Sequence, residues 1–314
     1  MGLWCGLKRP RFGRRAIKFK VVEEGMSRST PLPHWGERTY VMGIINVTPD
    51  SFSGDGLLTE REVVARALAQ AEQFVRGGAD ILDIGGESTR PGAAPVSAEE
   101  EMARVLPVIE ALSRQGWDAI LSVDTYKAEV AEAALRLGAH WVNDVWGLRA
   151  DERMAEVVAR YGAVVILMHN RSQPQHAELR ERLGGRYVGI DYEDLIEDIK
   201  RELLASVALA QAAGVPHEHI ILDPGIGFGK TVEQNLVLIQ RLDAFKALGY
   251  PILLGPSRKS FIGYTLNLPP DQRLEGTLAA VVLGVERGAD IVRVHDVEAV
   301  VRAVRMTEAI LRAG

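Results

Sequence analysis

The 314-residue sequence predicts an α/β fold, a single-domain (β/α)8 barrel of the TIM type. From Tyr40 onward, short apolar segments of strand-like composition alternate with amphipathic, helix-like segments. The apolar segments are nearly continuous, which is typical of parallel strands covered on both faces. With 47% hydrophobic and 25% charged residues, the composition is that of a globular protein rather than a disordered one. A doubly wound open sheet is the alternative that this alternation leaves open.

Eight segments are predicted to be strands: residues 40–46, 81–84, 120–123, 141–143, 164–168, 220–222, 252–255 and 291–294. Between them, segments such as 61–76 and 98–114 have the period of amphipathic helices. Ser97 and Glu100 predict a capping box at the start of the second of these helices. The phrase Gly-Ala-Asp-Ile at residues 78–81 recurs at 288–291, and its glycine suits the left-handed end of a helix.

The chain divides into an N-terminal extension, residues 1–38, and a barrel, residues 39–314. Residues 1–25 hold seven basic groups and two acidic ones, so we expect a flexible basic arm, with Met26 as an alternative start. The remainder is acidic, with 30 Lys and Arg against 40 Asp and Glu, which disfavours nucleic acid as a partner. A single cysteine excludes an internal disulfide, and no apolar run has the roughly 18–20 residues of a membrane helix. We therefore expect a soluble, cytoplasmic protein without a membrane partner.

Polar residues follow every predicted strand. They are Asn46, Asp83, Asp124, Asn143, Asp144, His169, Asp223, Ser257, Arg258, Lys259, Arg293 and His295. The carboxyl ends of barrel strands meet at one face, where the βα loops build the active site. Any one of these residues could be a helix cap or a turn residue, but their recurrence predicts a polar pocket with charges of both signs.

Two other motifs fail when they are tested against their required spacing. The segment GIGFGKT at residues 225–231 resembles a phosphate loop, but Pro224 stands where a Walker sequence needs glycine. Lys230 stands where a dinucleotide fingerprint needs glycine. We interpret these glycines as allowing the backbone to pass close to a flat ligand. The segment HEH at residues 217–219 lacks zinc-site spacing and is interpreted as surface.

Two long motifs resemble the signatures of the dihydropteroate synthase family: MGIINVTPDSFS at residues 42–53 and DIGGESTRPG at residues 83–92. Shorter segments follow in the family's order at residues 122–125, 143–145, 223–230, 255–260 and 293–297. The resemblance spans about residues 40–312. It implies a barrel enzyme of folate synthesis, a sulfonamide target. The enzyme would join (7,8-dihydropterin-6-yl)methyl diphosphate to 4-aminobenzoate and release diphosphate with help from Mg²⁺.

The resemblance also assigns roles residue by residue. The pterin would be bound by Thr89, Asp124, Asn143, Met168, Asp223, Lys259 and Arg293. The 4-aminobenzoate would be bound by Phe52, Thr89, Pro91, Phe228 and Ser260. The diphosphate would be received by Asn46, Arg90, Arg293 and His295, with Asn46 also ligating the metal. The catalytic set would be Asn46, Arg90, Lys259, Arg293 and His295. The last predicted helix, residues 297–312, carries more apolar residues than packing on a barrel requires, and with the resemblance it favours a homodimer.

The residue types suit this chemistry. A pterin presents N–H groups beside a carbonyl, which carboxylates, an amide and a lysine can meet in one plane. A diphosphate needs cations, which arginines and a metal supply. An arylamine is unprotonated at neutral pH, so no dedicated base is required. Because a dihydropterin can stabilise positive charge on its methylene, we predict a dissociative displacement, accelerated by orientation and leaving-group stabilisation.

The sequence departs from the family pattern in two regions. The family writes Ser-Asp-Gly-Gly after its first motif, whereas residues 53–56 read Ser-Gly-Asp-Gly and displace the carboxylate to Asp55. Asn170 replaces an apolar residue, and we interpret residues 170–190 as a mobile surface loop. Two alternatives remain. A pterin-dependent methyltransferase has no use for Asn46 and Thr89-Arg90, while a catalytically silent pterin-binding paralogue would fit the displaced Asp55.

Overall fold

The computed structural model describes residues 30–48, 59–89, 93–180, 182–188 and 190–313. Within these ranges, eight parallel strands form one sheet. They are β1 (Tyr40–Asn46), β2 (Ile81–Gly85), β3 (Ile120–Asp124), β4 (Trp141–Asp144), β5 (Val164–Met168), β8 (Ile220–Asp223), β9 (Leu253–Leu254) and β10 (Ile291–Val294). Each of the eight predicted strands is found, with both bounds within one residue of the predicted ones.

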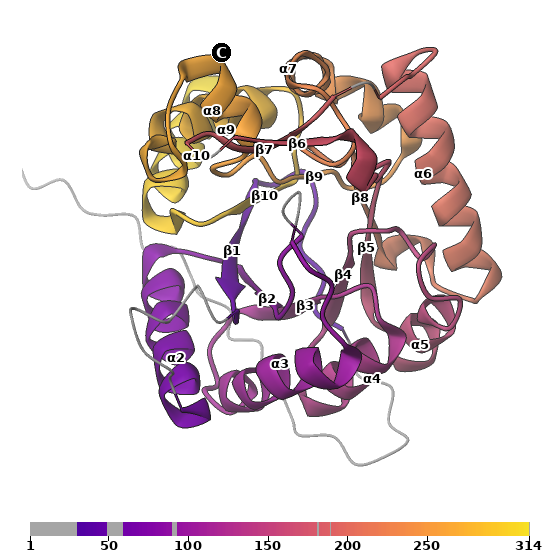
Figure 1. The fold of residues 1–314 in the computed structure, drawn as a ribbon. Helices are drawn as coiled ribbons and strands as arrows, with labels where there is room; N and C mark the ends of the chain where they lie inside the picture. The colour runs from indigo at the N-terminus through magenta and orange to yellow at the C-terminus, as the bar shows by residue number, and fades with distance from the viewer. Residues whose placement is uncertain (1–29, 49–58, 90–92, 181, 189, 314) are drawn as a thin grey trace, which may run out of the picture.

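The sheet closes into a barrel. Its strand order is β8-β5-β4-β3-β2-β1-β10-β9, and a parallel bridge between Leu222 and Ile252 joins the two end strands. Figure 1 shows the strands at the centre with the helices around them. The predicted (β/α)8 barrel is therefore confirmed, and the alternative prediction of a doubly wound open sheet is wrong.

Helices cover the outside of the barrel. They are α2 (Glu60–Gly77), α3 (Ala98–Ser113), α4 (Ala128–Leu137), α5 (Met154–Tyr161), α6 (Leu195–Ala212), α7 (Val232–Gln240), α8 (Ser260–Leu266), α9 (Leu274–Glu286) and α10 (Val297–Leu311). Short 3-10 turns occur at Pro174–His176, His217–His219, Leu242–Leu248 and Pro270–Gln272. In the part of the chain that the structure describes, no helix is long and apolar enough to cross a membrane.

The predicted capping box at α3 is half correct. Ser97 Oγ accepts a hydrogen bond from the Glu100 amide at 3.2 Å. The Glu100 carboxylate, however, forms an ion pair with Arg104 one turn later instead of reaching back to Ser97. Reciprocal boxes form instead at α2, between Thr59 and Glu62, and at α7.

The prediction of a plain surface loop over residues 170–190 is wrong. Strands β6 (Ala177–Arg180) and β7 (Gly184–Tyr187) form an antiparallel hairpin there. The hairpin is fastened to α8, where the Tyr264 hydroxyl donates to the Gly184 carbonyl at 3.1 Å. At its base Asn170 is buried, and its amide group donates to the Val145 carbonyl at 3.0 Å. Asn170 therefore secures the start of the hairpin by bonding to a neighbouring loop.

The hydrophobic core has two parts, as a closed barrel requires. Side chains that point outward from the strands pack beneath the helices in the larger cluster. Side chains that point inward form a smaller cluster inside the barrel, made of Tyr40, Met42, Ile81, Trp141, Val164, Ile166, Ile221, Leu253 and Ile291. Because strand side chains alternate between the two faces, these inward residues recur at every second position.

Residues 30–38 cover the amino-terminal end of the barrel. Leu32 and Trp35 pack against the inner cluster, and the Trp141 indole donates to the Pro31 carbonyl at 3.3 Å. Thr30 donates from its hydroxyl to the Gly162 carbonyl at 2.6 Å. The predicted extension of residues 1–38 therefore includes a segment that packs on the barrel, whereas residues 1–29 lie outside the described part.

Candidate active site

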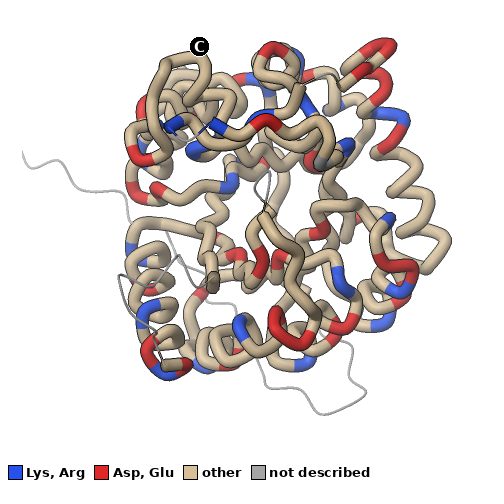
Figure 2. The backbone as a smooth tube through the Cα atoms, in the orientation of Figure 1, with Lys and Arg blue, Asp and Glu red and all other residues tan. Residues whose placement is uncertain are grey.

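The inward-facing residues change from apolar to polar along each strand. On five strands, an apolar residue of the inner cluster, or one packed against that cluster, is followed two positions later by a polar residue. The polar residues are Asp83 on β2, Ser122 on β3, Asn143 on β4, Asp223 on β8 and Arg293 on β10. Asp124 follows Ser122 on the same face. The polar positions lie towards the carboxyl ends of the strands, and Figure 2 shows charges of both signs near the barrel centre. Five residues predicted from the strand ends thus share the inner face of the barrel: Asp83, Asp124, Asn143, Asp223 and Arg293. Asp144 instead accepts from the Trp146 and Leu148 amides, and Arg258 pairs with Asp296.

Arg293 links three strands in this pocket. Its Nε donates to Asp83 Oδ2 at 2.6 Å, and its Nη2 donates to Asp124 Oδ2 at 2.6 Å. Asn143 Nδ2 donates to the same Asp83 oxygen at 2.9 Å. Asp83 is completely buried and was not among the residues that the family motifs assigned. It accepts hydrogen bonds from two residues that were assigned. Its sequence signals were its position at a strand end and its place at the start of the motif at residues 83–92.

Burial and charge oppose each other in this network. Burial raises the pKa of Asp124 to about 7, although the Arg293 guanidinium acts in the other direction. Burial also works against the charge on Arg293, but Asp83 and Asp124 outweigh it and raise the pKa of Arg293 above its ordinary value. The guanidinium therefore remains charged, whereas the Asp124 carboxyl changes its protonation near neutrality.

Asp223 and Lys259 form the second part of the pocket. Asp223 is buried at the end of β8, next to Met168 of β5 in the strand register. Its Oδ1 accepts from the Gly225 amide at 2.7 Å, and burial raises its pKa. Lys259 donates to the Ile226 carbonyl and lies over the Phe228 ring, 4.6 Å from its centroid. Burial lowers the pKa of Lys259 to about 8, with Asp223 opposing the shift.

Four more predicted site residues are described, at strand ends or in segments that follow a strand: Asn46, Thr89, Ser260 and His295. Asn46 is the last residue of β1, and Thr89 follows β2 in a loop. Ser260 begins α8 directly after Lys259. The His295 ring and its backbone amide lie 3.0 Å and 3.1 Å from Ser257 Oγ. Phe52, Asp55, Arg90 and Pro91 lie outside the described residues.

Two glycines of the GIGFGKT segment, residues 225–231, lie close to the backbone of a neighbouring loop. Gly225 and Gly229 have positive φ angles of 77° and 61°. A Cβ at Gly225 would lie 1.9 Å from the His169 carbonyl oxygen, and one at Gly229 would lie 2.3 Å from the Arg171 backbone. At these two positions glycine is therefore required by the close approach of the loop that follows β5.

Two predictions from the sequence concern metals: that Asn46 ligates Mg²⁺, and that the HEH segment at residues 217–219 is no zinc site. The described residues contain no group of three His, Cys, Asp or Glu side chains arranged to hold a metal ion. The segment HEH forms a 3-10 turn before β8, with His217 packed on the Tyr250 ring at 4.3 Å between centroids, which agrees with a surface role.

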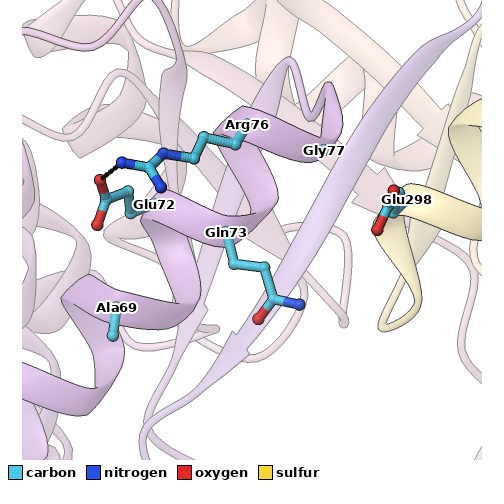
Figure 3. Close-up of a pocket in the computed structure, with 6 residues that line it drawn as sticks. All are labelled: Ala69, Glu72, Gln73, Arg76, Gly77 and Glu298. Carbon is cyan, nitrogen blue, oxygen red and sulfur yellow. Dashed lines mark hydrogen bonds and ion pairs between the residues drawn. The ribbon is translucent and has the colours of Figure 1, made fainter.

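A surface pocket lies away from this centre. Figure 3 shows its lining, which comes from α2 and α10: Ala69, Glu72, Gln73, Arg76, Gly77 and Glu298. Glu72 and Arg76 are already paired with each other at 2.5 Å. None of the predicted site residues lines this pocket, so we do not connect it with the reaction.

Comparisons with known proteins place the chain in a family whose members bind pterins. The family profile described as pterin binding enzyme matches residues 42–295. The fold and the site thus define a barrel enzyme of the pterin-binding class.

Individual relatives narrow this class. A dihydropteroate synthase of Clostridium beijerinckii is 49% identical over 278 residues, which cover 88% of this chain and 96% of the relative. The solved dihydropteroate synthase of Clostridium difficile, determined in the presence of pteroic acid, is 50% identical, covers 90% of this chain and 100% of its own, and has a TM-score of 0.80. The Xanthomonas albilineans dihydropteroate synthase with 4-aminobenzoic acid is 42% identical, covers 88% and 95%, and has a TM-score of 0.79. The chain belongs to the dihydropteroate synthase family, whose members are transferases of folate biosynthesis.

Proposed function

We propose that this chain condenses (7,8-dihydropterin-6-yl)methyl diphosphate with 4-aminobenzoate, giving 7,8-dihydropteroate and diphosphate. The observation that carries the proposal is the buried polar network of Asp83, Asp124, Asn143 and Arg293 at the carboxyl ends of four strands. Isolated charges in a barrel interior are costly, so a network of this kind is expected where a ligand completes it.

The pterin would lie between Asp124, Asn143, Asp223 and Lys259. The carboxylates accept from its N–H groups, and the lysine donates to its carbonyl. Asp223 is buried and Asp124 is partly buried, and both have raised pKa values, so both gain when a ligand donates hydrogen bonds to their charged forms. Met168, buried beside Asp223, would contact the pterin with its apolar side chain.

The diphosphate would lie towards Asn46, Arg90, Arg293 and His295. The two bonds from Arg293 to carboxylates use two of the five N–H donors of a guanidinium, which leaves donors for phosphate oxygens. Mg²⁺ typically binds through few protein ligands together with substrate phosphates, and the single amide oxygen of Asn46 fits such a site. The ion would supply positive charge to the leaving group, and Asn46 would fix its position.

The 4-aminobenzoate would lie on the side of Phe228, Ser260 and Thr89, completed by Phe52 and Pro91. Lys259, assigned to the pterin, lies over the ring of Phe228, assigned to 4-aminobenzoate, so the two substrates would bind on adjacent sides of this pair. Displacement at the pterin methylene is dissociative: the bond to diphosphate breaks as positive charge spreads into the dihydropterin ring. The neutral arylamine then attacks and releases its proton to water, without a dedicated base. Orientation and stabilisation of the leaving group account for most of the rate.

A homodimer would form through α9 and α10. Several large apolar side chains on these two helices are exposed: Val282, Leu283, Met306, Ile310 and Leu311. Contiguous exposed apolar surface marks an interface more often than a solvated face. Sedimentation should give a dimer mass for the unmodified chain and a monomer mass for a Leu283→Glu, Met306→Glu double variant.

One assay tests the function. The chain is incubated with the pterin diphosphate, 4-aminobenzoate and Mg²⁺, and dihydropteroate and diphosphate are measured together. Equal amounts of both products support the synthase, and a sulfonamide should then compete with 4-aminobenzoate. Pterin binding measured by calorimetry without either product would instead indicate the silent paralogue.

A further inference from the structure

Lys230 is a buried lysine that the family motifs leave without a role. Its side chain is among the largest fully buried ones described, and the residue is 2% exposed. Its Nζ lies 2.9 Å from His169 Nδ1, 2.9 Å from the Gly225 carbonyl oxygen and 3.0 Å from the Phe228 carbonyl oxygen. An ammonium group has three N–H donors, and here three acceptors receive them. Lys230 therefore has no donor left for a ligand and acts on the protein itself.

The two carbonyls that Lys230 binds enclose the segment that meets the substrates. Gly225 donates from its amide to Asp223, and the Ile226 carbonyl accepts from Lys259. Phe228 carries the ring over which Lys259 lies. The bonds from Lys230 thus hold both ends of a short segment whose middle carbonyl orients Lys259.

The third acceptor connects this segment to α6. His169 Nε2 lies 3.0 Å from Glu202 Oε2, and Glu202 also pairs with Arg171. With an ammonium at Lys230, Nδ1 must accept, so the ring proton is assigned to Nε2, which faces the Glu202 carboxylate. Burial, reinforced by Lys230, lowers the pKa of His169 to about 3, so the ring is neutral at working pH.

Burial also lowers the pKa of Lys230 well below its ordinary value, whereas Asp223 and Glu202 act in the opposite direction. The three acceptors around Nζ compensate the ammonium for the water that it loses on burial.

We propose that Lys230 is a positioning residue for the reaction, fixing residues 225–228 so that Lys259 and Phe228 present a single orientation to the two substrates. The proposal rests on the proposed function, because it assigns those two residues to substrate binding. Lys230 itself contacts neither substrate.

The test compares two lysines that are changed in the same way. Lys230→Met keeps the stem of the side chain and removes all three donors. Lys246→Met is the matched control, because Lys246 pairs with Asp290 at 2.9 Å, away from the strand carboxyl ends. We expect Lys230→Met to weaken pterin binding in calorimetry about tenfold and to lower kcat/KM about 100-fold, since small displacements of positioned groups have effects of this size. The control should keep both constants. Unchanged pterin affinity and kcat/KM in a folded Lys230→Met variant would overturn the proposal.

A measurement on the unmodified protein decides the matter if the variant does not fold. The ¹⁵N spectrum of the His169 imidazole should show a protonated Nε2 and an unprotonated Nδ1 near pH 7. A protonated Nδ1 would mean that Lys230 does not donate to His169, and the proposal would be wrong. If the unmodified protein forms no dihydropteroate, the proposed function fails, while pterin calorimetry and the imidazole spectrum still report on Lys230.

Discussion

The two ends of the barrel both carry buried or half-buried aspartates, but they use them in different ways. At the amino-terminal end, Asp80 accepts from the Val41 amide at 2.9 Å and pairs with Arg38. Asp290 repeats this arrangement, accepting from the Ile252 amide at 2.8 Å and pairing with Lys246. Both belong to the repeated Gly-Ala-Asp-Ile phrase, which therefore marks a carboxylate that bonds to the neighbouring strand.

At the carboxyl end, the aspartates bond to a cation that they share instead of to the amide of a neighbouring strand. Asp83 and Asp124 share one arginine, and Asp83 Oδ1 has no hydrogen-bond partner among the described residues. Burial raises the pKa of Asp124 and of Asp223. A carboxylate whose pKa rises on folding is destabilised in its charged form. The carboxylates at the amino-terminal end thus stabilise the barrel, whereas burial destabilises the charged forms of Asp124 and Asp223 at the carboxyl end, where we propose that substrates bind.

The largest effect is expected from Arg293→Met. The change leaves Asp83 and Asp124 buried without their shared cation, which typically costs about 3–5 kcal/mol. It also removes charge near the leaving group, so kcat should fall roughly 1,000-fold. Urea unfolding and initial rates measure the two losses. Arg38→Met, which breaks the exposed pair with Asp80, should leave kcat unchanged. An equal loss of kcat in both variants would contradict the division between the ends.

Asp223→Ala should affect binding at the carboxyl end. A hydrogen bond to a charged group contributes roughly 1.5–3 kcal/mol, so pterin affinity should fall by about 10–150-fold in calorimetry. The matched variant at the other end is Asp290→Ala. It should lower the free energy of unfolding by about 1–3 kcal/mol, because the Ile252 amide loses its buried acceptor, while pterin affinity stays the same. Unchanged pterin affinity in Asp223→Ala would show that this assignment is wrong.

The pH dependence of pterin binding should distinguish the ends further. Asp124 accepts pterin N–H groups only when it is ionised, and burial raises its pKa to about 7. Lys259 donates best when protonated, and burial lowers its pKa to about 8. Affinity should therefore rise as the pH increases through 7 and fall as it increases through 8. Asp124→Asn should lose the acid limb and keep the alkaline one, in calorimetry from pH 5.5 to 9. An acid limb that persists in this variant would belong to another group.

The strands were predictable because buried parallel strands are apolar runs that end where polar residues begin. Contacts between residues that lie far apart in the sequence were harder to predict. Strand β9 shortens to Leu253–Leu254, and Glu100 chooses Arg104 over its capping partner. The β6–β7 hairpin escaped prediction because its attachment comes from Tyr264 and not from its own sequence pattern. Asp83 was predicted for the polar pocket but was assigned no role, and Lys230 was not predicted as a site residue, for a related reason. Their partners, Arg293 and His169, lie far away in sequence, and a strand-end aspartate alone is no different from a helix cap.

The smallest effect is expected from removing residues 1–25, which no motif connects with the reaction. Turnover and thermal stability should both match those of the full chain. Removing residues 1–38 should differ, because Leu32 and Trp35 cover the inner cluster and Arg38 pairs with Asp80. We expect that longer truncation to lower the free energy of unfolding by about 3 kcal/mol or more, from the apolar burial lost with two large side chains. The folded fraction should retain pterin affinity, since these residues lie at the end of the barrel opposite the pocket. Lost turnover after the shorter truncation, with the melting temperature unchanged, would instead assign residues 1–25 a part in the reaction.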